Sequence, residues 1–309
     1  MNVSFNQDYK CFIYITDSGF TVWNCDPPTL RFERRMTEYS APLFMAEMLF
    51  ETNIFALVEK DTKRLLLWDD FQLKCIARLE FQESITSIRL RKEHILVTLI
   101  NSAIIYKFDN PPDVLSRYET APNMQGISAG SVGGNPAFAF PSKRVGEVSI
   151  VDLSTSDPVY IQAHTHPLFC IGLTRDGEKL ATASNRGTLI RLFNTITGQL
   201  IHEFRRGIDV ALVTDISFDE PGERIAVCSN KGTIHIFNLG GKNKQSALSA
   251  ISGILPQYFK SEWSEITFAI PIGSRASLGT DGSILIITVD GCFCRFDFSG
   301  NCTQKIQLI

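Results

Sequence analysis

Short runs of alternating hydrophobic and polar residues fill the chain, and Gly, Asn, Asp or Ser residues bound each run. Examples are CFIYI at 11–15 and IAVCS at 225–229. A period of two is typical of β-strands, whose successive side chains point to opposite faces. Long amphipathic helical patterns do not interrupt the series. The pattern therefore predicts an all-β protein.

A unit of strand, tight glycine turn and strand recurs along the chain. The two strongest copies are LATASNRGTLIRLFN at 180–194 and IAVCSNKGTIHIFN at 225–238, in which Gly187 aligns with Gly232. Weaker copies have their turns around Gly19, Lys63, Ser102, Gly146 and Gly291. Apart from a last interval of 59 residues, successive turns are 39 to 45 residues apart.

Repeats of this length with four short strands per unit are typical of β-propeller blades. Trp68-Asp69 supplies one WD dipeptide at the end of a predicted strand. Seven hairpins predict a seven-bladed β-propeller with WD-type blades, formed by residues 1–309 as one domain. Either the first strand or the last residues, CTQKIQLI at 302–309, could complete the seventh blade.

The excess length of the last interval lies in residues 240–264, which form a predicted long loop. The loop begins polar and then carries six large apolar or aromatic residues: Leu248, Ile251, Ile254, Leu255, Tyr258 and Phe259. So many apolar side chains in one loop are unusual for a plain connector. Two interpretations remain open from the residues: packing on the propeller wall or a protein partner, or entry into a membrane interface.

Two adjacent arginines, Arg205 and Arg206, lie between the two strongest repeats. Neighbours on a strand point to opposite faces, so we expect the pair to serve two separate sites. Arginine captures phosphate in a bidentate manner, which predicts two adjacent anion pockets. The flanking repeats supply matching hydroxyl, histidine and basic residues: His164, Ser184, Arg186, Thr188 and Arg191 on the earlier one, and Ser229, Lys231, Thr233 and His235 on the later one. Alternatively, such residues hydrogen-bond across strands and hold WD-type blades together.

Composition limits the other function classes. A net charge of -3 and a pI near 6.0 argue against a nucleic-acid binder. The chain has neither a stretch of about 20 apolar residues nor an apolar signal core at its start, so we expect a soluble, cytosolic protein. The eight cysteines form no C-x-x-C pair, and most lie in apolar runs, so we expect them to be buried thiols.

Candidate catalytic and metal-binding motifs are weak. His164 and His166 are expected on one strand face without further ligands nearby, which predicts no metal site. Asp69-Asp70 and Asp219-Glu220 are expected as solvated carboxylates at strand ends or turns. Since nothing pairs a nucleophile with a base, we expect neither an enzyme nor a bound cofactor.

The residues resemble the PROPPIN family, the phosphoinositide-binding propellers that include the WIPI proteins of autophagy. Phe204-Arg205-Arg206-Gly207 is similar to the family's F/L-R-R-G signature. The resemblance extends over nearly the whole chain, through FNQDYKCF (5–12), GFTVWNCDP (19–27), EMLFETNIFALV (47–58), LLLWDD (65–70), ATASNRGTLIRLF (181–193), SNKGTIHIF (229–237) and KNKQSALSAISGILPQYFKSEWS (242–264). Residues 240–264 thus resemble the long loop of the family's sixth blade.

This resemblance implies a monomer that binds phosphatidylinositol 3-phosphate and phosphatidylinositol 3,5-bisphosphate and recruits autophagy machinery. It implies a first site with Arg205 and the earlier set, a second with Arg206 and the later set, and bilayer insertion of the long loop. It also implies a cytoplasmic protein recruited to preautophagosomal or endosomal membranes, where it engages a lipid-transfer protein. The second-blade turn VEKDTKRL (58–65) is shorter than is usual in the family, so a partner contact there is in doubt. The alternative is a protein-interaction scaffold that uses the arginines and the loop.

Overall fold

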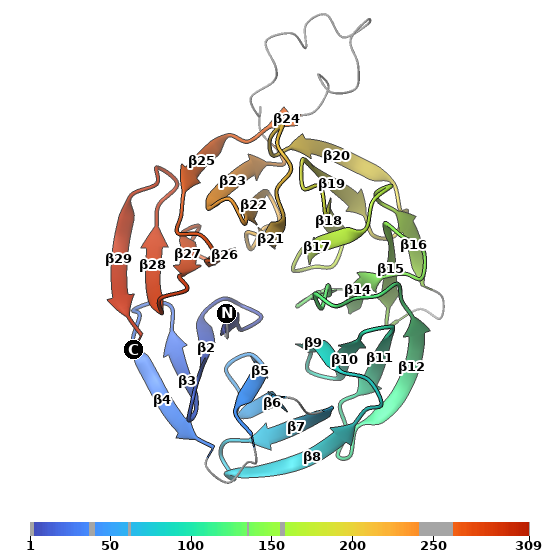
Figure 1. The fold of residues 1–309 in the computed structure, drawn as a ribbon, viewed down its shortest axis with the longest axis vertical. Coiled ribbons are helices and arrows are strands. Elements are labelled where there is room, and N and C mark those ends of the chain that lie inside the picture. The colour runs from blue at the N-terminus through green and yellow to red at the C-terminus, as the bar shows by residue number, and fades with distance from the viewer. Residues whose placement is uncertain are drawn as a thin grey trace, which may run out of the picture.

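Seven antiparallel sheets are arranged in a ring, one for each predicted blade (Figure 1). The computed structural model describes residues 3–36, 41–60, 63–134, 136–154, 158–240 and 262–308. The prediction of an all-β, seven-bladed propeller is confirmed.

Each blade takes its strands from consecutive segments, from the ring centre outward. Blades 1 to 4 contain β1 (Val3–Phe5), β2 (Cys11–Thr16), β3 (Gly19–Asn24), β4 (Leu30–Arg35); β5 (Leu43–Met48), β6 (Ile54–Glu59), β7 (Arg64–Asp69), β8 (Lys74–Glu80); β9 (Ile85–Leu90), β10 (His94–Leu99), β11 (Ser102–Lys107), β12 (Asp113–Glu119); and β13 (Ala129–Gly130), β14 (Ala137–Pro141), β15 (Glu147–Asp152), β16 (Val159–Gln162).

Blades 5 to 7 follow the same order, except that blade 5 gains one short strand from later in the chain. They contain β17 (Leu168–Leu173), β18 (Lys179–Ser184), β19 (Leu189–Asn194), β20 (Leu200–Arg205); β21 (Val213–Phe218), β22 (Arg224–Ser229), β23 (Thr233–Asn238), β25 (Ile266–Ala269); and β26 (Arg275–Leu278), β27 (Ile284–Ile287), β28 (Cys292–Phe296), β29 (Cys302–Gln307). This additional strand, β24 (Glu262–Trp263), pairs in parallel with β20 at the outer edge of blade 5.

The predicted glycine turns all join the second and third strands of a blade. Gly187 and Gly232 adopt the left-handed conformation, with φ of 57° and 71°. A Cβ atom on Gly187 would lie 1.8 Å from the carbonyl oxygen of Ala211, because the connection to the next blade passes directly over this turn. Glycine is therefore required there both by backbone conformation and by space.

The hydrophobic core is divided among the seven interfaces between neighbouring blades. Inner strands such as β6 are buried on both faces, whereas outer strands such as β4 and β29 alternate between exposed and half-buried residues. Each interface has a cluster of its own in the described part of the chain. Each blade thus buries its faces only against its two neighbours, as expected for a propeller.

The ring closes by packing, without exchange of a strand between the first and last blades. β1 pairs with β2 in blade 1, and the chain's last strand, β29, completes blade 7. The closing contact includes Phe12 and Phe293, whose rings stack with centroids 5.3 Å apart. Of the two closures left open by the sequence, the last residues therefore complete the seventh blade.

Two acidic residues expected in solvent are buried instead. Asp69 is 6% exposed and accepts hydrogen bonds from the backbone of Phe71 and Gln72, and Asp219 is 7% exposed and accepts two from Glu223 and Arg224. Both carboxylates satisfy backbone N–H groups of a turn, which compensates their burial. Asp70 forms an ion pair with Arg34, 2.6 Å from its Nε atom.

All eight cysteines are free thiols, and Cys302 alone is exposed. Among the described residues, none belongs to a helix with the length and hydrophobicity needed to cross a bilayer.

Candidate anion-binding site

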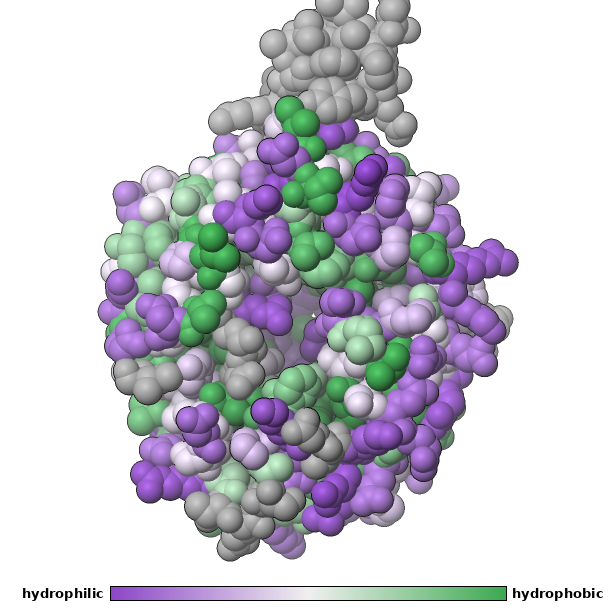
Figure 2. All heavy atoms as spheres, viewed as in Figure 1, coloured by the Kyte–Doolittle hydropathy of each residue, from purple (hydrophilic) through white to green (hydrophobic). Residues whose placement is uncertain are grey.

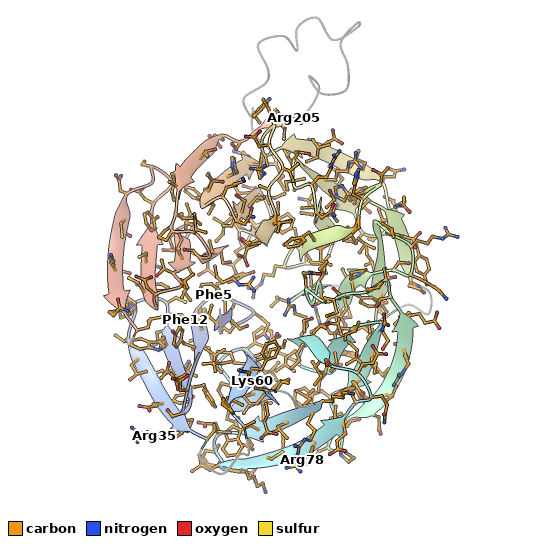
Figure 3. The ribbon with its side chains drawn as sticks, viewed as in Figure 1. Phe5, Phe12, Arg35, Lys60, Arg78 and Arg205 are labelled. Carbon is orange, nitrogen blue, oxygen red and sulfur yellow. The ribbon has the colours of Figure 1, made fainter. Side chains whose placement is uncertain are left out.

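The arginine pair stands at the end of β20, on the rim between blades 5 and 6. Figure 3 shows Arg205 at the outer edge of the ring, on the opposite side from Arg78. Phe204 anchors the strand in the core between the two blades, where its ring lies 4.9 Å from that of Phe237. By strand alternation, Arg205 shares the other face of β20 with Glu203, and Arg206 returns to the side of blade 6.

Arg206 is buried and is held by backbone groups. Its Nε donates to the carbonyl oxygen of Gly187 at 2.6 Å, and its Nη2 donates to that of Asp209. Its backbone N–H donates to the carbonyl oxygen of Thr188 at 3.0 Å. Two of the five guanidinium N–H groups are thereby occupied by described residues.

The predicted residues of the first site all belong to blade 5 or to the connection that enters it. Ser184 and Thr188 flank the Gly187 turn, and the Ser184 hydroxyl accepts a hydrogen bond from the backbone N–H of Arg186 at 3.4 Å. The Arg186 side chain is exposed, while Ser184 is buried. Arg205 pairs with Leu189, the residue after Thr188, so its backbone lies beside this turn.

Two other residues predicted for this site are engaged within the blade. His164 lies in the connection before β17, not on a strand as expected, and its Nε2 is 2.9 Å from the Thr182 hydroxyl. Arg191 donates to the Glu203 carboxylate at 2.9 Å and to the carbonyl oxygen of Ala163 at 2.6 Å. This network joins the strands of blade 5, so both side chains have a structural role within the blade.

The second set reproduces the first on blade 6. The Ser229 hydroxyl accepts from the backbone N–H of Lys231 at 3.4 Å, the same contact as in blade 5, and lies 2.9 Å from the Thr233 hydroxyl. Lys231 is exposed, as is Arg186. His235 Nδ1 lies 3.2 Å from both the Ser264 and the Thr267 hydroxyls.

Burial keeps the two histidines uncharged at neutral pH. It lowers the pKa of His164 to about 4, with Arg191 adding to the effect. It lowers the pKa of His235 to about 4 as well, and there the second cause is Arg206. Arg206 is therefore close enough to act on the blade 6 set, and the histidines contribute hydrogen bonds rather than charge.

Four residues of this region were absent from the predicted sets: Thr182, Glu203, Ser264 and Thr267. Alternation along the strands could have found the first two, since each lies two positions before a predicted residue on the same strand. The last two follow the irregular interval after β23, where the repeat no longer sets the register. Their position depends on β25 pairing with β23, which aligns Thr267 with His235.

The six loop residues from Leu248 to Phe259 lie outside the described residues. The described chain leaves blade 6 at Gly240 and resumes at Glu262 in β24, where Trp263 pairs with Arg205. The point of return is therefore beside the arginine pair.

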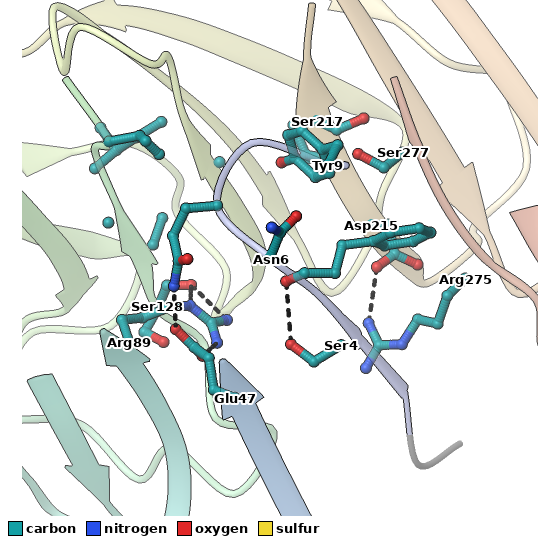
Figure 4. A pocket seen from close by; sticks show the side chains of 18 of the residues that line it. Ser4, Asn6, Tyr9, Glu47, Arg89, Ser128, Asp215, Ser217, Arg275 and Ser277 are labelled. Carbon is teal, nitrogen blue, oxygen red and sulfur yellow. Dashed lines mark hydrogen bonds and ion pairs between the residues drawn. The ribbon is translucent and has the colours of Figure 1, made fainter. Parts of the chain in front are cut away.

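The centre of the ring holds a polar cavity of about 270 Å³ (Figure 4). Figure 2 shows the corresponding opening on one face of the molecule. Its charged groups neutralise one another: Glu47 and Arg89 are 3.3 Å apart, and Asp215 and Arg275 are 2.8 Å apart. No group of three or more His, Cys, Asp or Glu side chains in the described part of the chain could hold a metal ion.

The chain is similar to known proteins in sequence and in fold. A family model described as PROPPIN matches residues 1–266. Autophagy-related protein 18e of Arabidopsis thaliana is 33% identical over 325 residues, covering 100% of this chain and 86% of that protein. SVP1-like protein 2 of Pichia angusta is 34% identical over 291 residues, covering 87% and 80%. The crystal structure of Hsv2 from Kluyvelomyces marxianus aligns with a TM-score of 0.83 and 26% identity, covering 100% and 98%.

Proposed function

This chain belongs to the PROPPIN family, and we propose that it binds phosphatidylinositol 3-phosphate and phosphatidylinositol 3,5-bisphosphate through two rim sites, one on blade 5 and one on blade 6. Family membership makes it a phosphoinositide-binding propeller of autophagy and a non-enzymatic effector. The finer assignment concerns which residues hold each headgroup.

Arg205 with Ser184, Arg186 and Thr188 forms the first site, and Arg206 with Ser229, Lys231, Thr233 and His235 forms the second. His164 and Arg191 support the first site from within the blade. Guanidinium and ammonium groups neutralise the phosphates, and the hydroxyls fix their orientation. The observation that carries this proposal is the duplicated turn: Ser184 and Ser229 accept the same backbone hydrogen bond at the same distance, on either side of one arginine pair.

Each site alone binds weakly, and the two act together on one membrane. After the first headgroup is bound, the second site meets lipid at a high effective concentration. Insertion of the loop at 240–264 adds to this attachment. The protein thus responds steeply to the density of 3-phosphorylated lipid, and it recruits a lipid-transfer protein to preautophagosomal or endosomal membranes.

Vesicle flotation tests the proposal directly. The double variant Arg205→Ala/Arg206→Ala is compared with the parent on vesicles that differ only in the presence of 3-phosphorylated phosphoinositide. The matched control, Lys143→Ala/Arg144→Ala, removes two cations from the corresponding turn of blade 4. We expect the arginine variant to stay unbound and the control to float with the parent.

If the folded arginine variant floats as well as the parent, the headgroup sites are wrong and a protein-interaction scaffold becomes the better account. Unfolding temperature is measured alongside, because Arg206 also holds two backbone carbonyl groups.

A further inference from the structure

The connection that follows the arginine pair exposes two aliphatic side chains on a firmly held backbone. Ile208 is 69% exposed and Val210 is 56% exposed. Arg206 binds the carbonyl oxygen of Asp209, which lies between them in the chain. Unlike a loose loop, this segment keeps its apolar groups in solvent at a fixed position.

Both neighbouring turns also hold the connection. The backbone N–H of Ala211 donates to the carbonyl oxygen of Arg186 at 3.2 Å, and that of Leu212 donates to the Asn230 side chain at 2.9 Å. Asn230 N–H returns a bond to the Leu212 carbonyl oxygen, also at 2.9 Å. The aliphatic pair is therefore tied to the Ser184–Thr188 turn and to the Ser229–Thr233 turn at once.

A second exposed aliphatic pair lies on the other side of the blade 6 turn. Ile272, in the connection from blade 6 to blade 7, is 71% exposed, and Val289, in the blade 7 turn, is 63% exposed. A Cβ atom on Gly232 would lie 3.0 Å from Ile272 Cγ1, and one on Gly273 would lie 2.6 Å from Val289 Cγ2. Ile272 therefore lies beside the Lys231 turn, and Val289 lies beside Gly273, the residue after Ile272.

All four residues lie on one face of the propeller. In an antiparallel blade, the turn between the second and third strands and the exit to the next blade are at the same end of the strands. The exposed cations Arg186 and Lys231 lie at this same end, in the turns between the second and third strands of blades 5 and 6. We call this surface of Ile208, Val210, Ile272 and Val289 the aliphatic border.

We propose that the aliphatic border enters the interfacial layer of an anionic phospholipid membrane when headgroups occupy the two rim sites. The inference rests on the proposed function and deepens it. In this arrangement the docked propeller is tilted, so that this face as well as the rim meets the lipid. Exposed aliphatic side chains with cations beside them are complementary to an anionic membrane surface, where apolar groups reach the acyl boundary and cations meet phosphates.

The border is also continuous with the headgroup sites, because the guanidinium of Arg206 contributes to one site and holds the backbone between Ile208 and Val210.

The test compares Ile208→Ser/Val210→Ser with the parent in two assays. Calorimetry with a soluble short-chain phosphatidylinositol 3-phosphate measures the headgroup sites alone, and flotation on vesicles containing the same headgroup measures the whole attachment. We expect unchanged headgroup affinity and about tenfold weaker vesicle binding, from the lost burial of several methyl and methylene groups. The matched control is Ile196→Ser/Leu200→Ser, which removes aliphatic residues that are 63% and 51% exposed at the opposite end of the blade 5 strands; its vesicle binding should equal that of the parent.

A direct readout uses Ile208→Trp and vesicles of brominated phospholipid. Quenching of fluorescence beyond that of the parent places this position in the acyl boundary and supports the proposal. If fluorescence is unquenched, or if Ile208→Ser/Val210→Ser floats like the parent, the membrane assignment is overturned and the border is a protein-docking surface instead. A parent that binds no soluble headgroup would contradict the proposed function itself, which separates the two failures.

Discussion

Blades 4 and 5 carry similar turns with opposite chemistry, although the turn from serine to glycine is one residue longer in blade 4. Each turn begins with a buried serine, contains an exposed arginine, and ends in a glycine with positive φ, Gly146 in blade 4 and Gly187 in blade 5. Thr188 follows the glycine in blade 5, whereas Glu147 follows it in blade 4. The Ser142 hydroxyl donates to the Glu147 carboxylate, so in blade 4 an acid engages the turn serine.

The outer strands differ in the same sense. The backbone N–H of Arg206 donates to Thr188 in blade 5, and that of Ala163 donates to Gly146 in blade 4, each at 3.0 Å. The position before it is Arg205 in blade 5, paired with Leu189, and Gln162 in blade 4, paired with Glu147. On the proposed assignment, three side chains decide whether a blade of this fold carries an anion site, which is the usual separation of fold from site.

Transferring the blade 4 acid to the other two turns should have the largest effect. In Thr188→Glu/Thr233→Glu, each carboxylate faces the phosphate of its site, and like-charge contacts cost several kcal/mol, or about hundredfold in affinity per site. Vesicle flotation should be abolished. Thr188→Val/Thr233→Val is the control for size and should lose only the hydroxyl contacts, about fivefold per site; equal losses in the two variants would contradict the charge argument.

Acid should destabilise blades 5 and 6 through their histidines. His164 and His235 have pKa values of about 4 in the folded protein, below the ordinary value of 6.5, so the unfolded chain binds more protons between these values. Their contribution to stability is present above pH 6.5 and is lost as the pH falls towards 4, by about 2 kcal/mol per histidine between pH 7 and 5.

Urea unfolding measured from pH 7 to 5 should show this fall in the free energy of unfolding. His164→Gln and His235→Gln should each make the fall smaller. His166→Gln, at a histidine that is only half-buried, is the matched control for the substitution itself. A parent whose stability does not change from pH 7 to 5 would refute the assignment of both histidines as buried and neutral.

Breaking the ion pair between Arg191 and Glu203 should strengthen headgroup binding at the first site, and this effect should be smaller than the two above. In Glu203→Gln the ion pair is lost and Arg191 can turn towards a phosphate, which predicts about threefold tighter binding of the soluble headgroup and a modest loss of stability. Calorimetry checks the affinity. If binding weakens, Glu203 is required to position Arg191, and the competition between carboxylate and phosphate is not the controlling factor.

Removing the acid from blade 4 should have the smallest effect on binding. Glu147→Thr supplies a hydroxyl after the turn glycine, as in blade 5, but Gln162 and Ala163 still stand where the arginines are needed. We expect the number of soluble headgroups bound per chain to stay at the parent value. An additional site in this variant would show that the turn alone suffices and that the arginines are dispensable.

The fold could be predicted because its signals are local and repeated. Each turn glycine and each alternating run reports on its own blade, and the period then implies the ring. The turn residues of the candidate sites, such as Ser184 and Ser229, could be predicted for the same reason.

Contacts made by tertiary pairing could not be predicted in this way. Ser264 and Thr267 reach His235 only because β25 pairs with β23 after an irregular interval, and β24 joins blade 5 although it follows blade 6 strands in the chain. The burial of Asp69 and Asp219 was missed because the backbone donors that satisfy them belong to turns whose geometry no pattern in the sequence specifies.

Counting bound headgroups tests the central claim most directly. Calorimetric titration of the parent with a soluble short-chain phosphatidylinositol 3-phosphate should give two sites per chain, and Thr188→Glu and Thr233→Glu should each leave one. A parent that binds a single headgroup, or a single variant that still binds two, would contradict the assignment of one site to each of blades 5 and 6.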